Sequence, residues 1–303
     1  MFPIPILLLL MADDSSNLTP GDHRRALNVD GRARDYLVHV PKGYDGSRAF
    51  PVVLAFHGGL SNADRMVDFS GLSEKGDQAG FLAVYPNGTG RAEGAYTWNG
   101  GNCCGYAQDQ NVDDVAFVRA LLDDLERVAR VDAKRIYATG MSNGGLMAYR
   151  LADELSDRIV AIAPVGGPMG TETCRPKRPV SVIHFHGTDD KFAPFTGGRG
   201  ERSVSQTHFY SVQHSLDNWI RANGCPREPV VTALEPVVSD GTRVTKSVYG
   251  PGREQSEVVL VRIEGAGHTW PGRKPPLLFL GKSTANISAN DLMWEFFEKH
   301  PRK

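Results

Sequence analysis

The chain has 303 residues, of which 41% are hydrophobic and 23% are charged, and its formal net charge is −1. This length and composition are typical of a globular chain that buries one large core. Its basic residues are scattered, so charge gives no basis for binding nucleic acid or an anionic membrane surface. We expect neither nucleic acid nor stable membrane insertion among its interactions.

The first residues form an apolar segment unlike the rest of the chain. Residues 2–11 are uniformly apolar, too few to span a bilayer but enough for the core of a secretory signal. Ala12 suits the cleavage point, although no Lys or Arg precedes the run. We predict a signal-like leader and disordered N-terminus at residues 1–19, a folded domain at 20–303, and a secreted or periplasmic protein. The alternative is an unstructured apolar tail.

The chain contains four cysteines, Cys103, Cys104, Cys174 and Cys225. An even number behind a signal-like leader favours disulfides in an oxidising compartment. Cys103 and Cys104 are adjacent, and a bond between them would strain the peptide that joins them. We therefore expect each to pair with a distant cysteine. No His or Cys spacing completes a zinc site, so we predict no bound metal.

Apolar runs of strand length alternate with helical patterns through the first half of the chain. The predicted strands are residues 34–40, which alternate apolar and polar side chains, and the apolar runs 50–58 and 80–86. Residues 111–131 repeat apolar side chains at helical spacing, and Asn111 or Asp113 would cap that helix. Asp113 and Asp114 are both interpreted as capping groups at its start.

The same alternation continues to the end of the chain. The predicted strands are residues 135–140, 159–167, 179–187 and 256–265, and the predicted helices are 144–155, 208–224 and 288–300. Ser288 suits the cap of the last helix. Interleaved strands and helices predict a single-domain α/β fold, with a mostly parallel central sheet and helices on both faces. In such sheets ligands bind beyond the carboxyl ends of the strands.

The stretch GMSNGG, residues 140–145, follows a predicted strand and opens a predicted helix. Residues 140–144 fit G-x-S-x-G, in which a tight strand-to-helix turn exposes a nucleophilic serine. The glycines allow a backbone conformation that side chains would forbid. A serine hydroxyl is a poor nucleophile at neutral pH, so Ser142 needs a base and an acid elsewhere in the chain.

The base is expected among the histidines that follow or end strands. His268 lies in GAGHTWPG, a glycine-rich loop after the strand 256–265, where the base falls in the chain order Ser…Asp/Glu…His. We predict that His268 is the base; the alternative is a histidine on a surface loop. His57 and His186 each precede a glycine at a strand end, and we expect a structural or pocket-lining role for both.

The acid is expected after the strand 179–187, where HGTDDKFAP contains Asp189 and Asp190. An imidazole needs one carboxylate on its far nitrogen, which holds the tautomer and stabilises the charge that develops. We choose Asp190 as the acid and interpret Asp189 as a turn residue.

The negative charge that develops on a substrate oxygen needs preorganised N–H donors. One is expected from the backbone of Asn143, the residue after the nucleophile, because amides at a helix start are free. The other is expected from Gly59 or Leu60 in HGGLS, the loop after the strand 50–58. The alternative for this loop is a plain glycine turn.

Taken in order, the segments HGG, NGGNCCG, VDDV, GMSNGG, HGTDD and GAGHTWPG resemble the polyhydroxybutyrate depolymerase and feruloyl/acetylxylan esterase family of α/β-hydrolases. The resemblance runs from about residue 33 to 299. It implies an α/β-hydrolase fold and a secreted serine esterase that uses no metal or organic cofactor. The family's catalytic triad carries over to Ser142, Asp190 and His268.

The resemblance also implies that the segment around Trp98, Cys103 and Cys104 lies beside the active site. Trp98 and Trp270 are then candidates to line an acyl or aromatic pocket; the alternative is that both are ordinary buried aromatics. Residues 271–284 form an insertion with an apolar stretch, 277–280, that either caps the pocket or rests on the surface.

The substrate is expected to be an ester on a small molecule or a polysaccharide. No appended binding module or Ser/Thr/Pro linker is present, so we prefer feruloyl or acetyl esters on plant polysaccharides or oligosaccharides. The alternative is hydrolysis of polyhydroxybutyrate-type polyesters or their oligomers. A peptidase of this fold and a catalytically silent binding protein are weaker alternatives, the latter because nucleophile, acid and base are all present.

Overall fold

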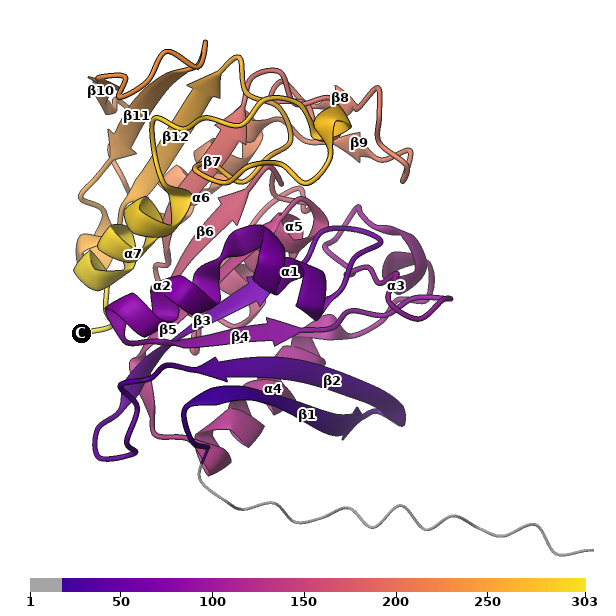
Figure 1. The fold of residues 1–303 in the computed structure, drawn as a ribbon. Coiled ribbons are helices and arrows are strands. Elements are labelled where there is room, and N and C mark those ends of the chain that lie inside the picture. Colours follow the sequence, from indigo (N-terminus) through magenta and orange to yellow (C-terminus); the bar gives the residue numbers. More distant parts are fainter. Residues whose placement is uncertain (1–17) are drawn as a thin grey trace, which may run out of the picture.

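The computed structural model describes residues 18–303, and the predicted cleavage point and apolar run of the leader lie outside this range. The described chain forms a ten-stranded sheet in the order β1-β2-β4-β3-β5-β6-β7-β12-β11-β10 (Figure 1). The six central strands run parallel to one another. They are β4 (Leu82–Pro86), β3 (Phe50–Phe56), β5 (Val131–Met141), β6 (Ala161–Val165), β7 (Ser181–Gly187) and β12 (Val258–Glu264). The prediction of a mostly parallel sheet is confirmed.

Antiparallel strands extend the sheet at both edges. They are β1 (Gly21–Val29), β2 (Arg32–Val40), β10 (Val230–Leu234) and β11 (Arg243–Tyr249). Only β2 was predicted. The outermost strands carry many polar or exposed side chains, and β1 shows no fully buried position. The sequences of β1 and β11 mix polar and apolar side chains and lack the apolar runs that revealed the central strands, whereas β10 is a short apolar stretch of five residues that lies largely exposed.

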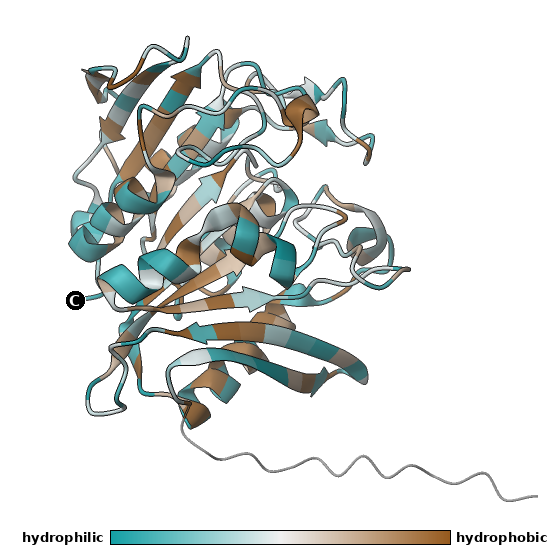
Figure 2. Ribbon diagram, in the orientation of Figure 1, coloured by the Kyte–Doolittle hydropathy of each residue, from teal (hydrophilic) through white to brown (hydrophobic). Residues whose placement is uncertain are grey.

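Helices cover both faces of the sheet, as predicted. One face carries α4 (Asp114–Val128), α5 (Asn143–Glu154) and α6 (Val212–Asn223), and the other carries α1 (Ala63–Ser70), α2 (Leu72–Ala79) and α7 (Ala289–Lys299). Along β3 the side chains alternate between the two cores: Leu54 and Phe56 join the first, and Val53 and Ala55 the second. The central strands are accordingly mostly brown in Figure 2, and the outer surfaces of α1 and α2 are teal.

The shorter elements lie in the connections. They are α3 (Gly105–Asp109), β8 (Gly198–Arg199), β9 (His208–Phe209), η1 (Arg253–Gln255) and η2 (Leu278–Leu280). The helix predicted to start at residue 208 begins at Val212, because the Ser211 hydroxyl caps it by accepting from the His214 N–H. Among residues 18–303, no helix has the length and apolar content needed to cross a membrane. The same residues contain no cluster of three or more potential metal ligands.

The predicted helix caps are confirmed at Asp113 and Ser288, whose side chains accept from backbone N–H groups of the first turns of α4 and α7. The interpretation of Asp114 as a second capping group is wrong. Its side chain is buried, and one carboxylate oxygen accepts from the Arg34 guanidinium at 2.8 Å. The other oxygen accepts from the Asn99 N–H at 2.8 Å. Asp114 therefore ties α4 to β2 and to the loop that contains Trp98.

The cysteine pairing differs from the prediction. Cys103 and Cys104 lie against each other, and Cys174 and Cys225 are free thiols, so the expectation that each adjacent cysteine finds a distant partner is wrong. The two adjacent cysteines and the two later ones lie in different parts of the fold. Cys103 and Cys104 pack in a small cluster with Leu146, whereas Cys174 and Cys225 pack against the core beneath α4, α5 and α6.

Removing one partner of a buried ion pair leaves the other charge buried and uncompensated. We therefore expect Asp114→Asn to lower the free energy of unfolding by about 3–5 kcal/mol. The control is Asp64→Asn, which breaks the Arg24–Asp64 pair, whose side chains are 47% and 63% exposed. That change should cost less than about 1 kcal/mol in chemical denaturation. Equal losses in the free energy of unfolding for the two variants would contradict the importance of the buried Arg34–Asp114 pair.

Candidate active site

Ser142 stands at the turn between β5 and α5 in a conformation that side chains rarely adopt. Its φ is 56° and its ψ is −121°. Its N–H donates to the Val165 carbonyl at 2.8 Å, and its carbonyl accepts from the Gly145 N–H at 2.7 Å. Neighbouring backbone therefore holds this strained turn on both sides, as expected where a serine is presented at the end of a strand.

Glycines around this turn allow the backbone segments to approach closely. A Cβ built on Gly144 would overlap the carbonyl oxygens of Phe56 and His57, and one built on Gly167 would overlap the carbonyl of Ser142. Only glycine fits at these two positions. The strand β3, the β5–α5 turn and the loop after β6 therefore pack backbone against backbone around Ser142.

Asp190 and His268, the predicted acid and base, are hydrogen-bonded to each other. The Nδ1 atom of His268 lies 2.6 Å from Oδ2 of Asp190. The other carboxylate oxygen accepts from the N–H groups of Phe192 at 2.8 Å and Ala193 at 2.9 Å. Burial alone would raise the pKa of Asp190, but the charge and hydrogen bond of His268 hold it below its ordinary value. Asp190 therefore stays ionised.

Asp189, the alternative acid, is an exposed turn residue. Its carboxylate accepts from the neighbouring Thr188 hydroxyl at 3.0 Å, and its N–H donates to the Ala266 carbonyl. The interpretation of Asp189 as a turn residue is therefore confirmed.

Ser142 and the Asp190–His268 pair lie on two sides of one turn, formed by Gly166 and Gly167 after β6. A Cβ on Gly166 would lie 3.3 Å from Nδ1 of His268 and 3.5 Å from Oδ2 of Asp190, whereas Gly167 contacts the Ser142 carbonyl. Ser142, Asp190 and His268 follow β5, β7 and β12, parallel strands whose carboxyl ends lie on the same side of the molecule. The fold thus places the serine on one side of the Gly166–Gly167 turn and the bonded imidazole and carboxylate on the other.

The predicted oxyanion loop is held by His57. The Gly88 N–H donates to Nε2 of His57 at 3.0 Å, so the proton of the neutral ring sits on Nδ1 and is donated to the Gly58 carbonyl at 2.8 Å. Burial lowers the pKa of His57 to about 4, which keeps the ring neutral. A peptide's C=O and N–H point in opposite directions, so anchoring the Gly58 carbonyl also orients the Gly59 N–H.

Two further features bear on the predicted oxyanion donors. Leu60 has a left-handed φ of 58°, and Gly59 faces the first residue of α5, with a built Cβ 3.8 Å from that of Asn143. The Asn143 side chain is locked by the Trp98 backbone: it accepts from the Trp98 N–H at 2.7 Å and donates to the Trp98 carbonyl at 2.9 Å. The loop after β3 and the start of α5 therefore face each other beside Ser142.

Trp98 and Trp270, the predicted pocket-lining residues, are both buried. The Trp98 indole packs 4.9 Å from the His57 ring and donates to the His57 carbonyl at 3.0 Å. Trp270 donates to Asn290 at 2.9 Å and meets Phe69 edge to face. Both rings support the loops of the site from within the core, and their contact with substrate stays a prediction.

An apolar surface borders His268 on its solvent side. The Phe192 ring stacks on the imidazole at 4.9 Å and lies 6.1 Å from Phe279, whose neighbour Leu278 is 93% exposed. The insertion 271–284 reaches this place because the His268 N–H donates to the Leu280 carbonyl at 2.7 Å. Figure 2 shows the short helix η2 of this insertion in brown. Phe192 lies within the segment HGTDDKFAP, two residues after Asp190, and was given no role from the sequence.

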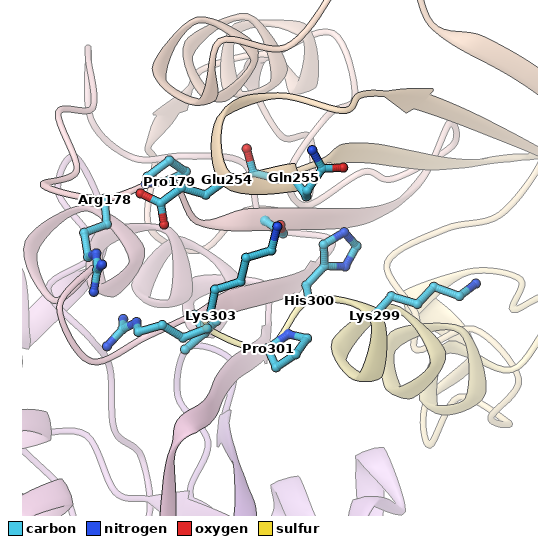
Figure 3. Close-up of a pocket in the computed structure, with 12 residues that line it drawn as sticks. Arg178, Pro179, Glu254, Gln255, Lys299, His300, Pro301 and Lys303 are labelled. Carbon is cyan, nitrogen blue, oxygen red and sulfur yellow. The ribbon is translucent and has the colours of Figure 1, made fainter.

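A cavity of about 160 Å³ lies elsewhere, between the end of α7 and the starts of β6 and β7 (Figure 3). Its lining includes Arg178, Glu254 and His300. Parallel strands begin at this edge of the sheet, opposite the edge where Ser142 and His268 lie. This cavity is therefore separate from the candidate site.

The chain is similar to known esterases. Residues 34–176 match the family described as "Esterase PHB depolymerase". The chain is 30% identical over 286 residues to NocK, a putative esterase of Nocardia uniformis subsp. tsuyamanensis, covering 90% of this chain and 81% of the relative. It is also 30% identical over 202 residues to feruloyl esterase B of Piromyces equi, covering 65% of this chain but only 37% of that protein.

The fold is also found among solved structures. Acetyl xylan esterase from Aspergillus awamori superposes with a TM-score of 0.62 at 13% identity, covering 91% of this chain and 99% of that one. With the parallel sheet and its covering helices, this likeness confirms the predicted single-domain α/β-hydrolase fold.

The packing around Ser142 predicts a strong effect of one added methyl group. Gly144→Ala would push a Cβ into the carbonyl groups of β3, and we expect the free energy of unfolding to fall by about 3 kcal/mol. The control is Gly43→Ala, where the added Cβ meets no atom within 4 Å and which should change stability by less than about 0.5 kcal/mol. Thermal and chemical denaturation measure both. A neutral Gly144→Ala would refute the close approach.

Proposed function

The chain belongs to the PHB depolymerase esterase family and is a carboxylic ester hydrolase, and from this premise we propose that Ser142 is its nucleophile, His268 its general base and Asp190 the carboxylate that orients the base. The observation that carries this assignment is the 2.6 Å bond between His268 and Asp190 beside the strained Ser142 turn. A serine, a histidine and a buried carboxylate in this arrangement are the parts that acyl transfer requires.

In the first half of the proposed reaction, His268 takes the proton of the Ser142 hydroxyl. The resulting oxygen attacks the ester carbonyl, and the charge that develops is met by the N–H groups of Asn143 and of Gly59 or Leu60. The tetrahedral intermediate collapses, His268 returns the proton to the departing alcohol, and an acyl-enzyme remains on Ser142.

In the second half, water enters the position that the alcohol has left. His268 takes a proton from this water, which attacks the acyl-enzyme through a second oxyanion held by the same N–H groups. The acid leaves and the proton returns to Ser142. Asp190 stays ionised throughout and stabilises the imidazolium. No step uses a metal or an organic cofactor.

The proposed substrates are feruloyl or acetyl esters on plant polysaccharides or oligosaccharides. This proposal is supported by the similarity to a protein named feruloyl esterase B. The Phe192 ring beside His268 supplies an aromatic face for an acyl group such as ferulate. We also propose that the chain is exported after removal of its leader and that the described residues form its catalytic domain.

A second candidate substrate is a polyhydroxybutyrate-type polyester or its oligomers. One observation favours it: Leu277, Leu278 and Phe279 are 51%, 93% and 52% exposed, and the last lies against Phe192 at the site. Apolar side chains exposed beside an active site suit contact with an apolar polymer surface.

A fluorophosphonate probe tests the nucleophile. We expect the wild-type protein to be labelled once and Ser142→Ala to stay unlabelled, because the probe reacts only with an activated serine. Ester hydrolysis by Ser142→Ala should fall by a factor of about 10⁶, and by Asp190→Asn by about 10⁴. The matched control is Ser181→Ala, a buried serine at the opposite edge of the sheet. Equal labelling of wild type and Ser142→Ala would overturn the proposal.

Parallel assays on methyl ferulate, acetylated xylan and hydroxybutyrate oligomers separate the two substrate classes. We expect higher kcat/KM on the first two. A Leu278→Ser variant should leave their hydrolysis within a factor of about two, because this side chain points into solvent. Hydrolysis of the oligomers alone, with loss in Leu278→Ser, would replace the polysaccharide proposal by the polyester one.

A further inference from the structure

A chain of three buried polar side chains leads from helix α5 to the turn that holds Asp190. The Tyr149 hydroxyl lies 3.0 Å from Nδ1 of His184, and Nε2 of His184 lies 2.9 Å from Nδ1 of His186. Nε2 of His186 then lies 2.8 Å from the Ala193 carbonyl oxygen. His184 and His186 are two residues apart on β7, so their side chains share one face of the strand. We call these three side chains the Tyr149–His186 chain.

The last acceptor sets the direction of every bond in the Tyr149–His186 chain. A carbonyl oxygen only accepts, so Nε2 of His186 carries a proton and Nδ1 of the neutral ring must accept. The proton shared with His184 then sits on Nε2 of His184, whose Nδ1 accepts from the Tyr149 hydroxyl. Each group therefore donates toward Asp190, and the aligned dipoles present their positive end to it.

All three groups are held in the neutral form that this direction requires. Burial lowers the pKa of both His184 and His186. Burial also raises the pKa of Tyr149, so its hydroxyl keeps its proton. A proton added to Nδ1 of His186 would face the N–H of His184 Nε2, and one added to Nδ1 of His184 would reverse the bond with the Tyr149 hydroxyl.

His186 reaches Asp190 by two routes. Its Nε2 lies 3.5 Å from Oδ2 of Asp190, the same oxygen that binds His268. Its bond to the Ala193 carbonyl also anchors the turn whose Ala193 N–H donates to Oδ1 of Asp190 at 2.9 Å. One ring thus acts on both oxygens of the carboxylate, on one directly and on the other through the turn.

We propose that His186 is a positioning residue, which, with His184 and Tyr149 behind it, holds the Asp190 carboxylate charged and aimed at His268. This inference rests on the proposed function, because it assigns work to the acid of the proposed triad. The dipoles supply positive potential at Asp190 and so oppose a further proton on the Asp190–His268 pair.

The other titratable groups near the chain are paired or neutral. On the neighbouring strand β12, Arg262 lies opposite His186 in register, but its guanidinium binds Glu264 at 2.6 Å. At the far end, burial raises the pKa of the Cys174 thiol to about 12, so the group near Tyr149 carries no charge. The donor end of the Tyr149–His186 chain therefore faces Asp190 and, through it, His268.

The test is the pH profile of kcat/KM on a soluble ester. In His186→Phe the donor is lost, and we expect the acidic midpoint to move up by roughly half to one pH unit. At the pH optimum kcat should fall about tenfold with KM nearly unchanged, because no substrate group touches His186. In His186→Gln the side-chain amide still donates near the Nε2 position, and we expect most of both effects to be reversed.

A milder variant keeps the inference testable if His186→Phe fails to fold. Tyr149→Phe removes only the hydroxyl at the start of the chain, and its acidic midpoint should move in the same direction by a few tenths of a pH unit. The matched control is Tyr85→Phe, another buried tyrosine, whose hydroxyl lies 2.9 Å from that of Ser73 on the opposite core. It should leave the midpoint unchanged.

Three outcomes decide the matter. Upward shifts in His186→Phe and Tyr149→Phe, with recovery in His186→Gln, support the positioning role. Unshifted profiles in all of these variants, with only stability reduced, overturn it and leave the triad standing. If Ser142→Ala or Asp190→Asn keeps full activity, the proposed function fails first, and this inference fails with it.

Discussion

The site depends on the close approach of three backbone segments around Ser142. Glycine at 144 lets the start of α5 touch β3, and glycine at 167 lets the loop after β6 touch the Ser142 carbonyl. Side chains at these positions would separate the segments by the width of a methyl group. Two backbone hydrogen bonds, from the Ser142 N–H to Val165 and from the Gly145 N–H to the Ser142 carbonyl, support its left-handed φ.

A second constraint is electrostatic. A buried carboxylate is costly unless its oxygens are fully hydrogen-bonded, and Asp190 meets this condition with His268, two backbone N–H groups and the nearby His186 ring. Its surroundings are otherwise neutral. On the far side of the site, His57 is also buried and neutral, and orients the loop of the proposed oxyanion donors. Neutral histidines therefore orient groups on both sides of the charged Asp190 carboxylate, without adding charges that would compete with it.

The sequence predicted those parts of the molecule that are built from local patterns. The central strands and the helix now seen at Asp114–Val128 carry continuous apolar runs or a helical stripe, and the residues around Ser142 form a motif with a defined turn. Features made by residues far apart in the chain were missed. Asp114 looked like a cap because its partner Arg34 is 80 positions away. The HFHG segment showed two histidines on one face, but nothing local indicated Tyr149 or the polarity of the chain.

The two sides of the Asp190–His268 pair differ in what encloses them. The buried side of the Asp190–His268 pair is closed by β7, α5 and the Tyr149–His186 chain, so no ligand reaches it from there. The open side is bordered by Phe192 and by the insertion that carries Leu278, both outside the central sheet. On the proposed function, a substrate approaches across these apolar side chains whatever ester it carries. On the proposed function, we expect changes in this insertion to alter which acyl group or polymer is accepted, and changes beneath Asp190 to alter the pH dependence of hydrolysis.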